Sequence, residues 1–542
     1  MPRQHREIAV GEDALPTGTG RHFENPFDGR TLFQAFADAC RRYGGSEPVV
    51  EDAVGGKSGY RRILTGARII ARRIAPLTDE GEAVAVLLPN ANGVLATFLA
   101  LQSAARIPAM LNYTAGPSTV LAACDTVKAR LVISSRAFVE KAGLEPIVAR
   151  LEGAGLTFFW LEDLQKSVSK LEKALGWLFA LRPMVRARPE QAGLILFTSG
   201  SEGLPKGVVL SHHNVLSNCA QIATRIEFGP KDKLFNVLPV FHSFGITGGM
   251  ILPLLYGVRL YLYPSPLHFK IIPQAVARVK PTIMFGTDTF LNGYARTAKD
   301  SDFASLRMVV AGAEAVKDET RLTWAQRFDT LVLEGFGMTE ASPVVAVNSP
   351  HGNRPGSVGQ LLPGIEHRLE PVEGITEGGR LWLRGPNVMM GYMTHDRPGE
   401  LQTLDDGWHD SGDIVALDSE GFVSIKGRAK RFAKVAGEMV SLGAIELMAK
   451  SLWPEENHAV VTIPDSRRGE RIVLVTTASK AERDALLAAS RQRGYTELWV
   501  PNAIIKVLEI PVLGSGKTDY ASAKIIALGD TGTVTLAGTG PG

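Results

Sequence analysis

The sequence predicts an α/β protein with a large, multi-subdomain N-terminal region of parallel-rich sheets, a small β section and a small C-terminal α+β domain. Its 542 residues are too many for one compact core and indicate several domain-sized units. From about residue 30 to 430, short apolar runs alternate with stretches of helical periodicity, a pattern typical of buried parallel strands covered by helices. From 356 to 425 the apolar runs become short and turn-rich, which indicates the separate β section.

Individual elements follow from the same patterns. Apolar runs predict strands at 83–88, 131–134, 156–160, 194–197, 208–210, 282–285, 308–311 and 330–334. Helical periodicity predicts helices at 32–43, 93–105, 273–279 and 318–328. The longest apolar region, 83–111, is interrupted by polar residues and a proline, so we interpret it as a strand, a turn and a core helix rather than a membrane span. The last residues, GDTGTVTLAGTGPG, are predicted to be disordered.

Composition excludes some classes of function. Hydrophobic residues make up 45% and charged residues 21% of the chain, as in ordinary globular proteins. The net charge of +3 is small, so the chain as a whole does not predict nucleic-acid binding. The three cysteines form no CxxC or zinc pattern, and the N-terminus has no apolar signal-peptide core. We therefore expect a reduced, cytoplasmic setting.

One segment, 166–188, combines positive charge with helical periodicity. Its six basic residues face a single acid, Glu172, and its apolar residues recur at helical spacing: Lys166, Lys170, Lys173, Arg182, Arg186 and Arg188, with Val168, Leu171, Leu175 and Leu178. Such a helix can lie on the anionic cytoplasmic face of a membrane or dock an acidic partner. The interpretation we favour here is an ordinary surface helix with its apolar stripe turned toward the core.

A polar turn separates the apolar runs at 194–197 and 208–210, in the segment FTSGSEGLPKG (197–207). Its glycines, hydroxyls and single lysine suit a polyanion, because glycine lets the backbone approach phosphate oxygens. Composition alone leaves a plain polar hairpin turn equally open. A P-loop is excluded, because Lys206 follows Pro205 rather than glycine, and because LGSGKT (513–518) has Pro511 where the P-loop spacing requires glycine.

Seven motifs then follow one another in a fixed order. They are FTSGSEGLPKG (197–207), PVFHSFG (239–245), AGAE (311–314), EGFGMTE (334–340), HDSGD (409–413), KGRAKRFAKVAGEMVS (426–441) and VLGSGKTD (512–519). In this order, over about residues 30 to 527, the chain resembles the adenylate-forming enzymes: acyl- and aryl-CoA ligases, luciferase-like enzymes and peptide-synthetase adenylation domains. FTSGSEG, LYPSPLHF, GRAKRFAKVAGEMVSL and PVLGSGK resemble more closely the acyl-[acyl-carrier-protein] synthetase module, which in some bacteria is fused to a lysophospholipid acyltransferase.

The resemblance implies a two-step reaction with ATP and Mg²⁺. A carboxylate attacks the α-phosphate of ATP to give an acyl-adenylate and pyrophosphate, and a thiol then takes the acyl group. The phosphates would be held by the turn residues Thr198, Ser199, Gly200, Ser201, Gly203 and Lys206. Glu202 departs from the family's usual threonine. Glu340 matches the Mg²⁺ carboxylate, a hard oxygen ligand, and Thr339 the α-phosphate donor.

The resemblance also implies a nucleoside site and a catalytic lysine. The adenine would lie between Phe336 and the segment Gly312, Ala313 and Glu314, with Glu334, Gly335 and Met338 completing the ATP-binding set. Asp413 matches the acid that binds both ribose hydroxyls, Arg428 a second ribose or phosphate contact, and His242 the position beside the substrate carboxylate. Lys517 matches the lysine that bridges carboxylate and α-phosphate oxygens. Taken alone, GFGMTE and DSGD are ordinary turns, and His242 is a structural histidine.

The implied domain plan is a large AMP-binding domain at 1–427, a hinge at 428–433 around Lys430, a mobile cap domain at 434–528 and a tail at 529–542. Arg431, Lys434 and Gly437 would then face the thiol carrier. We further expect this basic face to suit acyl carrier protein, which is acidic.

Three functions remain to be weighed. The first is a fatty-acid ligase that acylates the phosphopantetheine of acyl carrier protein, with CoA as the alternative acceptor; its acyl site would be lined by 241–250 and 285–291. The second is a lysophospholipid acyltransferase, which generally uses a histidine with an aspartate five residues later; none of the eleven histidines has one, so any such activity would belong to a separate partner at the membrane. The third is a non-catalytic binder, disfavoured because Lys517, Glu340 and Asp413 are all present.

Overall fold

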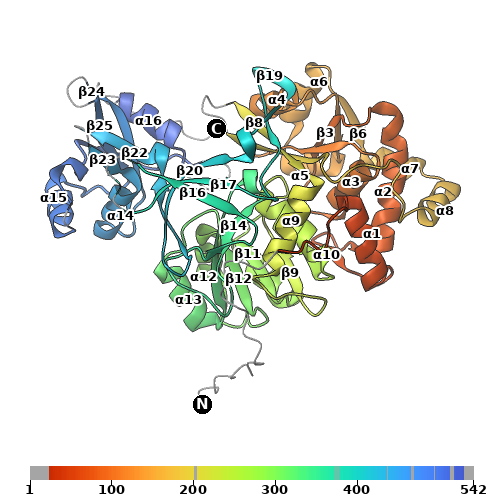
Figure 1. The fold of residues 1–542 in the computed structure, drawn as a ribbon, viewed down its shortest axis with the longest axis horizontal. Coiled ribbons are helices and arrows are strands. Elements are labelled where there is room, and N and C mark those ends of the chain that lie inside the picture. The colour runs from red at the N-terminus through yellow and green to blue at the C-terminus, as the bar shows by residue number, and fades with distance from the viewer. Residues whose placement is uncertain are drawn as a thin grey trace, which may run out of the picture.

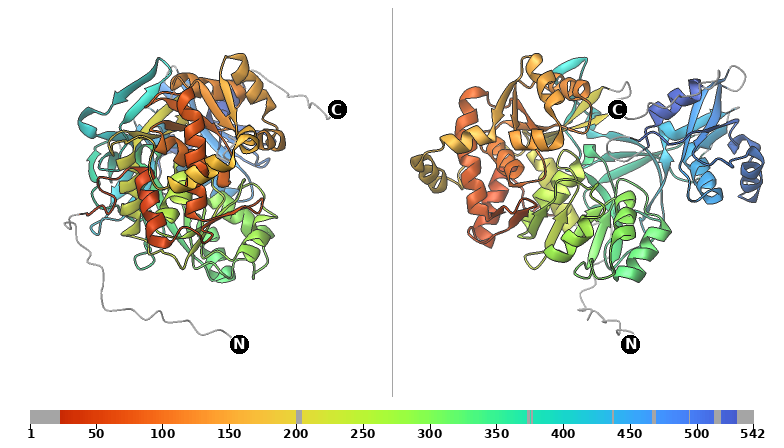
Figure 2. Two further views of the ribbon diagram at one scale, coloured as in Figure 1. Left: turned by 90° about the vertical axis from the view of Figure 1, so that its right-hand side faces the viewer. Right: turned by 180° about the vertical axis from the view of Figure 1, so that it is seen from behind.

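A computed structural model describes residues 23–199, 204–372, 375, 377–435, 438–465, 469–493, 495–512 and 518–529. Figure 1 shows a large body built around two sheets, with the C-terminal segment, in blue, set to one side of it. The view from behind in Figure 2 shows the same separation. The predicted α/β class, with a large N-terminal region and a small C-terminal domain, is confirmed.

The first sheet of the body has eight strands in the order β19-β18-β8-β7-β4-β3-β5-β6. Its strands are β3 (Ala83–Leu87), β4 (Ile107–Met110), β5 (Leu131–Ser134), β6 (Thr157–Trp160), β7 (Ala192–Ser199), β8 (Pro205–Ser211), β18 (Gly391–Thr394) and β19 (Arg397–Thr403). Strands β3 to β7 pair in parallel, whereas β7 and β8 form an antiparallel hairpin. The accompanying helices are α1 (Leu32–Tyr43), α2 (Tyr60–Ile74), α3 (Asn92–Ser103), α4 (Pro117–Thr126), α5 (Arg136–Ala142), α6 (Glu145–Gly153), α7 (Leu161–Ser167) and α8 (Lys170–Leu178).

The second sheet has nine strands in the order β15-β14-β13-β12-β11-β9-β10-β1-β2. They are β1 (Val50–Asp52), β2 (Lys57–Ser58), β9 (Lys233–Asn236), β10 (Arg259–Leu262), β11 (Ile283–Gly286), β12 (Met308–Ala311), β13 (Leu331–Gly337), β14 (Val344–Val347) and β15 (Gln360–Leu361). Its central strands run parallel. The helices of this part are α9 (His212–Ala223), a π-helix (Phe244–Ile251), α10 (Leu252–Leu255), α11 (Ile272–Val279), α12 (Asp288–Thr297) and α13 (Asp318–Phe328).

All eight predicted strands and all four predicted helices occur, with bounds shifted by at most a few residues. The predicted β section at 356–425 divides differently, because β15, β18 and β19 extend the two large sheets. Only β16 (Glu366–Glu370), β17 (Gly379–Arg384), β20 (His409–Leu417) and β21 (Val423–Arg428) form a separate antiparallel sheet. Strand β21 leads through a single turn, Ala429–Arg431, into the C-terminal domain.

The C-terminal domain has its own sheet and its own apolar cores. Its elements are β22 (Phe432–Val435), β23 (Glu438–Ser441), α14 (Leu442–Leu452), β24 (His458–Asp465), β25 (Gly469–Thr476), α15 (Arg483–Gln492), β26 (Ala503–Lys506) and α16 (Tyr520–Gly529). The predicted domain bounds and the motion about a hinge stay predictions. Among the residues that the structure describes, no helix has the length and apolar character that crossing a bilayer requires.

Of the core-facing stripe predicted for 166–188, Val168 packs against the core, but the prediction is wrong for Leu171 and Leu178. Leu171 and Leu178 of α8 are 68% and 59% exposed. The buried residue of this helix is Gly176, where an added Cβ would lie 3.0 Å from the Ile69 side chain of α2. Because the glycine face lies against α2, the leucines on the other side of α8 point toward solvent.

Candidate active site

The β7–β8 hairpin places the first group of predicted phosphate-binding residues. Thr198 lies opposite Lys206 in the antiparallel register, so both stand beside the turn that closes the hairpin. Gly200, Ser201 and Gly203 lie outside the described residues, and so does the side chain of Ser199. The Lys206 ammonium lies 5.3 Å from the ring centroid of Tyr392 on the neighbouring strand β18, a cation–π distance.

A cluster around Glu340 brings together segments that are far apart in the sequence. The Tyr392 hydroxyl donates a hydrogen bond of 2.8 Å to Oε1 of Glu340. Burial, together with the adjacent Glu340 carboxylate, raises the pKa of Tyr392, so the phenol stays a donor. The His409 ring lies 6.4 Å from that of Tyr392, and burial lowers the pKa of His409. Sequence reasoning assigned no role to Tyr392 or His409, although both stand inside segments that it singled out.

This cluster suits a magnesium ion that is shared with phosphates. Mg²⁺ in such sites is typically held by one or two carboxylates, with phosphate oxygens and waters supplying the other ligands. In the described part of the chain no group of three or more potential metal-ligating side chains occurs. Glu340 with Tyr392 and Lys206 therefore fits an ion brought in with its phosphate ligand rather than an all-protein metal cage.

Asp413 and Arg428 form a second pair, at the register of β20 and β21. Arg428 Nε lies 2.9 Å from Oδ1 of Asp413, whose side chain is only 3% exposed. Burial raises the pKa of Asp413 to about 6 against the opposing effect of Arg428, and the nearby Glu340 and Asp410 carboxylates add to the rise. Oδ2 of Asp413 is buried and has no hydrogen-bond partner among the described residues. A buried carboxylate oxygen without a donor fits a ligand that brings hydroxyl groups.

The predicted adenine segments lie side by side where β12 and β13 end. A Cβ on Gly312 would lie 3.2 Å from the carbonyl oxygen of Gly335, so the two backbones are in close approach. Ala313 adopts a left-handed φ of 68°, and it is exposed. The half-buried Phe336 follows on β13. The structure thus brings the two predicted walls together.

Two acids in these segments are already engaged. The Glu314 carboxylate accepts hydrogen bonds from the backbone and hydroxyl of Thr289, at 3.1 and 2.7 Å. Glu334 is buried and ion-paired with Arg321. Their side chains therefore fix the loop and the strand, and the carbonyl oxygen of Glu334 is also engaged, since it accepts from the amide of Asn348 at 2.9 Å. The Met338 amide likewise donates to a backbone carbonyl within its own turn.

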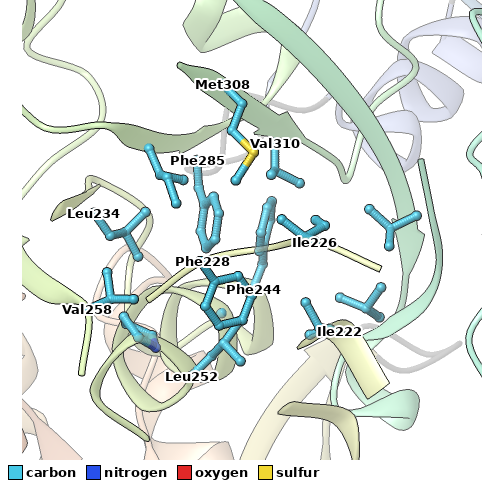
Figure 3. A pocket seen from close by; sticks show the side chains of 15 residues that line it. Ile222, Ile226, Phe228, Leu234, Phe244, Leu252, Val258, Phe285, Met308 and Val310 are labelled. Atoms are coloured by element: carbon cyan, nitrogen blue, oxygen red, sulfur yellow. The ribbon is translucent and has the colours of Figure 1, made fainter. Parts of the chain in front are cut away.

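An apolar cavity lies next to the polar cluster. The Thr339 and Ser243 hydroxyls are 3.4 Å apart, and Ser243 stands between His242 and Phe244. Phe244 opens the π-helix and stacks on Phe285, with centroids 5.1 Å apart. Figure 3 shows both rings turned toward the same space as Met308 and Val310. The lining is formed by Ile222, Ile226, Phe228, Leu234, Phe244, Gly248, Leu252, Pro253, Val258, Ile283, Phe285, Met308, Val310, Val344 and Val347.

The cavity matches part of the predicted acyl site. The predicted wall 241–250 contributes Phe244 and Gly248, and 285–291 contributes Phe285. The remaining lining comes from α9, β9, α10, β11, β12, β14 and the loops beside them, whose convergence had no local signal in the sequence. The cavity encloses about 50 Å³, well below the roughly 300–1,000 Å³ of small-molecule sites, so in this conformation it has room for only a few methylene groups.

The C-terminal residues divide into described and undescribed positions. Lys517 and Gly437 lie outside the described residues, and so do the side chains of Lys430 and Lys434. Arg431 is held inside the C-terminal domain, where its guanidinium pairs with Glu446 and lies 3.7 Å from the ring centroid of Tyr520. The side chain is only 20% exposed. Contrary to our expectation, Arg431 does not present a free cation to a carrier protein in this conformation.

Comparisons with known proteins agree with this geometry. The family model of the AMP-binding enzyme matches residues 36–393. A long-chain-fatty-acid–CoA ligase of Salmonella typhimurium is 26% identical over 91% of this chain and 94% of its own length. A feruloyl-CoA synthase of Amycolatopsis is 31% identical over 60% of this chain and 67% of its own length.

Among solved structures, ATP-bound MatB from Rhodopseudomonas palustris superposes with a TM-score of 0.78 at 23% identity, covering 91% of this chain and 98% of that one. An anthranilate CoA ligase with bound anthranoyl-AMP gives 0.77 at 20% identity, covering 93% and 99%. At these identities the superpositions show a shared fold. The family match over residues 36–393, together with the clustered motifs, shows that this chain belongs to the AMP-binding enzyme family.

Proposed function

We propose that this protein is an AMP-forming acid–thiol ligase that activates a fatty acid with ATP and transfers the acyl group to a thiol. The observation that carries the proposal is the contact between Thr339 and Ser243. It joins the polar cluster of Glu340, Tyr392 and Lys206 to the apolar cavity that begins at Phe244. A carboxylate at this junction would have its hydrocarbon chain in the cavity and its oxygens beside the phosphates.

The first half-reaction follows from this placement. A carboxylate oxygen forms a bond to the α-phosphorus, and the bond from that phosphorus to the oxygen of the departing pyrophosphate breaks. Lys206 and the donors of the β7–β8 turn would neutralise charge on the leaving phosphates, where fixed cations are worth most. Glu340 would hold Mg²⁺, which supplies charge neutralisation at the phosphate oxygens, while the Tyr392 hydroxyl fixes the carboxylate orientation. Asp413 would accept the ribose hydroxyls through its unpartnered oxygen.

In the second half-reaction a thiol sulfur bonds to the acyl carbon and AMP leaves. Lys517, which matches the catalytic lysine of the family, would act in the first step. It would withdraw in the second step as the C-terminal domain turns about Lys430. This motion remains part of the proposal.

CoA is the thiol that we favour. The relative from Salmonella typhimurium, which matches 91% of this chain, and the relative from Bacillus subtilis, which matches 60% of it, are both named long-chain-fatty-acid–CoA ligases. Acyl carrier protein is the second candidate, supported by the wording of FTSGSEG and LYPSPLHF, but Arg431, one of the three residues expected to recognise it, is paired internally.

The lining of the cavity supports an aliphatic acid. All of its side chains are hydrocarbon, sulfur-containing or absent, so the cavity offers an acyl tail no side-chain hydrogen-bond partner. An aromatic acid with ring hydroxyl or amino groups would leave those groups unpaired there, which costs binding free energy. We therefore place aliphatic acids ahead of feruloyl- or anthranilate-type acids, and we propose a medium or long chain because relatives are named medium- or long-chain ligases.

The test has two stages. Pyrophosphate release is measured with ATP, Mg²⁺ and short, medium and long fatty acids and one aromatic acid; the proposal expects release with the longer aliphatic acids. AMP release is then compared with CoA and with holo acyl carrier protein as acceptor. Lys517→Ala should abolish pyrophosphate release, whereas Lys524→Ala, an exposed lysine on α16, should leave it unchanged. Failure of every acid to release pyrophosphate would overturn the assignment.

A further inference from the structure

Helix α8 projects from the edge of the large domain. Figure 1 shows it at the outer end of the molecule opposite the C-terminal domain, and Figure 2 shows it projecting in the reverse view also. It packs on α2, where Gly176 approaches Ile69 and the Arg61 guanidinium donates to the carbonyl oxygen of Trp177 at 2.8 Å. One side of the helix is therefore fixed to the body and the other is left to solvent.

The outward side carries four apolar residues and Lys170. Leu171, Trp177 and Leu178 are 68%, 57% and 59% exposed, and Ala174 between them is exposed as well. At 3.6 residues per turn these four positions fall within an arc of about 120°. Gly176 lies outside this arc, on the side toward α2. Among the described residues α16 carries two exposed large apolar side chains, Ile525 and Leu528, whereas α8 carries three. Leu171 and Leu178 lie on its outward side, and Trp177 lies beside them, where the Arg61 guanidinium of α2 is 4.4 Å from the ring centroid.

Positive charge surrounds this face. Lys170 and Lys173 are exposed on α8 itself, and Lys166, Arg182 and Arg186 are exposed just before and after it. The acid of the helix, Glu172, is turned toward α2, where it pairs with Arg73 at 2.8 Å, so it does not offset the lysines on the outward side.

We propose that α8 and its flanking basic residues dock this protein on a lipid surface that carries anionic headgroups. The leucines would enter the boundary between headgroups and acyl chains, the indole of Trp177 would lie at headgroup depth, and the lysines would contact the phosphates. Charge complementarity selects an anionic surface. The shape also fits, because a projecting convex helix can be laid on a bilayer, whereas a protein partner would need a groove to receive it.

Docking in this way has a consequence for the proposed function. Long-chain fatty acids partition into bilayers, so a docked ligase would meet its substrate at the surface where that substrate is concentrated. This consequence rests on the proposed function, but the docking itself does not, and it is measured without ATP or acid. A failure of one therefore leaves the other standing.

The experiment is co-sedimentation of the full chain with vesicles of phosphatidylcholine, with and without phosphatidylglycerol. We expect binding to the anionic vesicles that weakens as salt is raised. Lys170→Ala with Lys173→Ala should weaken the partition coefficient roughly 30-fold, about fivefold per lysine. Leu171→Ser with Leu178→Ser should weaken it by roughly tenfold or more, since less apolar surface is buried.

Matched controls change the same residue types elsewhere. Leu322→Ser alters a leucine that is 56% exposed on α13, and Lys231→Ala with Lys299→Ala removes two exposed lysines far from α8 in the sequence. These variants should bind vesicles like the unmodified protein, and unchanged thermal unfolding shows that each variant is folded. Equal binding to neutral and anionic vesicles, or an α8 variant that binds like the controls, would overturn the proposal. It would also be overturned if the α8 variants lost binding only to acyl carrier protein.

Discussion

The unpartnered oxygen of Asp413 gives the sharpest prediction. The substitution Asp413→Asn keeps the size of the side chain but removes its charge. If the unpartnered oxygen accepts both ribose hydroxyls, as we propose, then the variant weakens both hydrogen bonds, because a neutral amide oxygen is a poorer acceptor than a carboxylate, and it places its NH₂ group toward Arg428. The position is buried, so solvent does not replace what is lost.

The size of the effect follows from the burial and the charge. Hydrogen bonds to charged groups contribute about 1.5–3 kcal/mol each. A net loss of about 2–3 kcal/mol corresponds to roughly 30- to 150-fold weaker binding of AMP. Asp405→Asn, the same change at an exposed acid on the turn before β20, should leave AMP affinity unchanged.

Titration of Asp413 adds a pH dependence. With a pKa of about 6 in the free protein, the carboxylate becomes protonated below pH 6, and AMP affinity should fall about tenfold per pH unit there. The folded-state pKa is raised above its ordinary value near 4, so the folded state binds a proton that the unfolded chain has already lost between about pH 4 and 6. The contribution of Asp413 to stability is therefore greatest below pH 4 and is lost as pH rises to 6, by about 3 kcal/mol at most.

Isothermal titration calorimetry with AMP from pH 5 to 8 measures the binding, and denaturant unfolding from about pH 3 to 7 measures the stability. The Asp413→Asn variant should show weak binding without the step near pH 6. AMP affinity that is the same in the variant and in the unmodified protein would refute the ribose assignment. If Asp405→Asn lost as much AMP affinity as Asp413→Asn, the effect would not be specific to Asp413.

Three further predictions concern the cavity and the packing. Gly248→Leu should fill part of the apolar cavity and displace about two methylenes, at ~0.8 kcal/mol each, lowering kcat/KM for a long fatty acid roughly 15-fold; equal loss for short acids would contradict this. Gly245→Ala should lower the melting temperature, because the added Cβ would overlap a backbone carbonyl oxygen. Gly66→Ala in α2, where the added Cβ has its nearest neighbour at 3.8 Å, should instead raise the free energy of unfolding by about 0.5–1 kcal/mol. A Gly66→Ala variant less stable than Gly245→Ala would contradict the packing described here. Arg431→Met should destabilise the C-terminal domain by about 3 kcal/mol, and adding Glu446→Leu should restore most of it in denaturant unfolding, an outcome absent if the pair is not buried.

Elements with a complete local signal were predicted correctly from the sequence. Strands β5 and β12 are short, continuous apolar runs, and all four residues of each are buried. Helix α1 begins where Thr31 and Gln34 form a capping box, and its apolar face meets the core. In these cases the same few residues determine both the local conformation and the side that is buried, so periodicity is sufficient.

The candidate site was predictable only in part. The ordered motifs indicated Glu340, Asp413 and Lys206, because each stands in a recognisable local pattern. The hydrogen bond from Tyr392 to Glu340 joins residues 52 positions apart, and no spacing rule predicts such a pair. Arg431 shows the converse, since its local sequence indicated a surface cation and the fold buried it against Glu446.

The sequence by itself determined the α/β class, the order of the strands along the chain and the identity of the residues that we propose to carry charge near the phosphates. The tertiary structure decided which of those residues meet, that Asp413 keeps one oxygen without a donor, and that Leu171 and Leu178 of α8 face solvent. The physical reason is that periodicity records which side of a helix or strand is apolar. Whether that side is covered, and what lies across from a polar group, depends on segments that are distant in the chain.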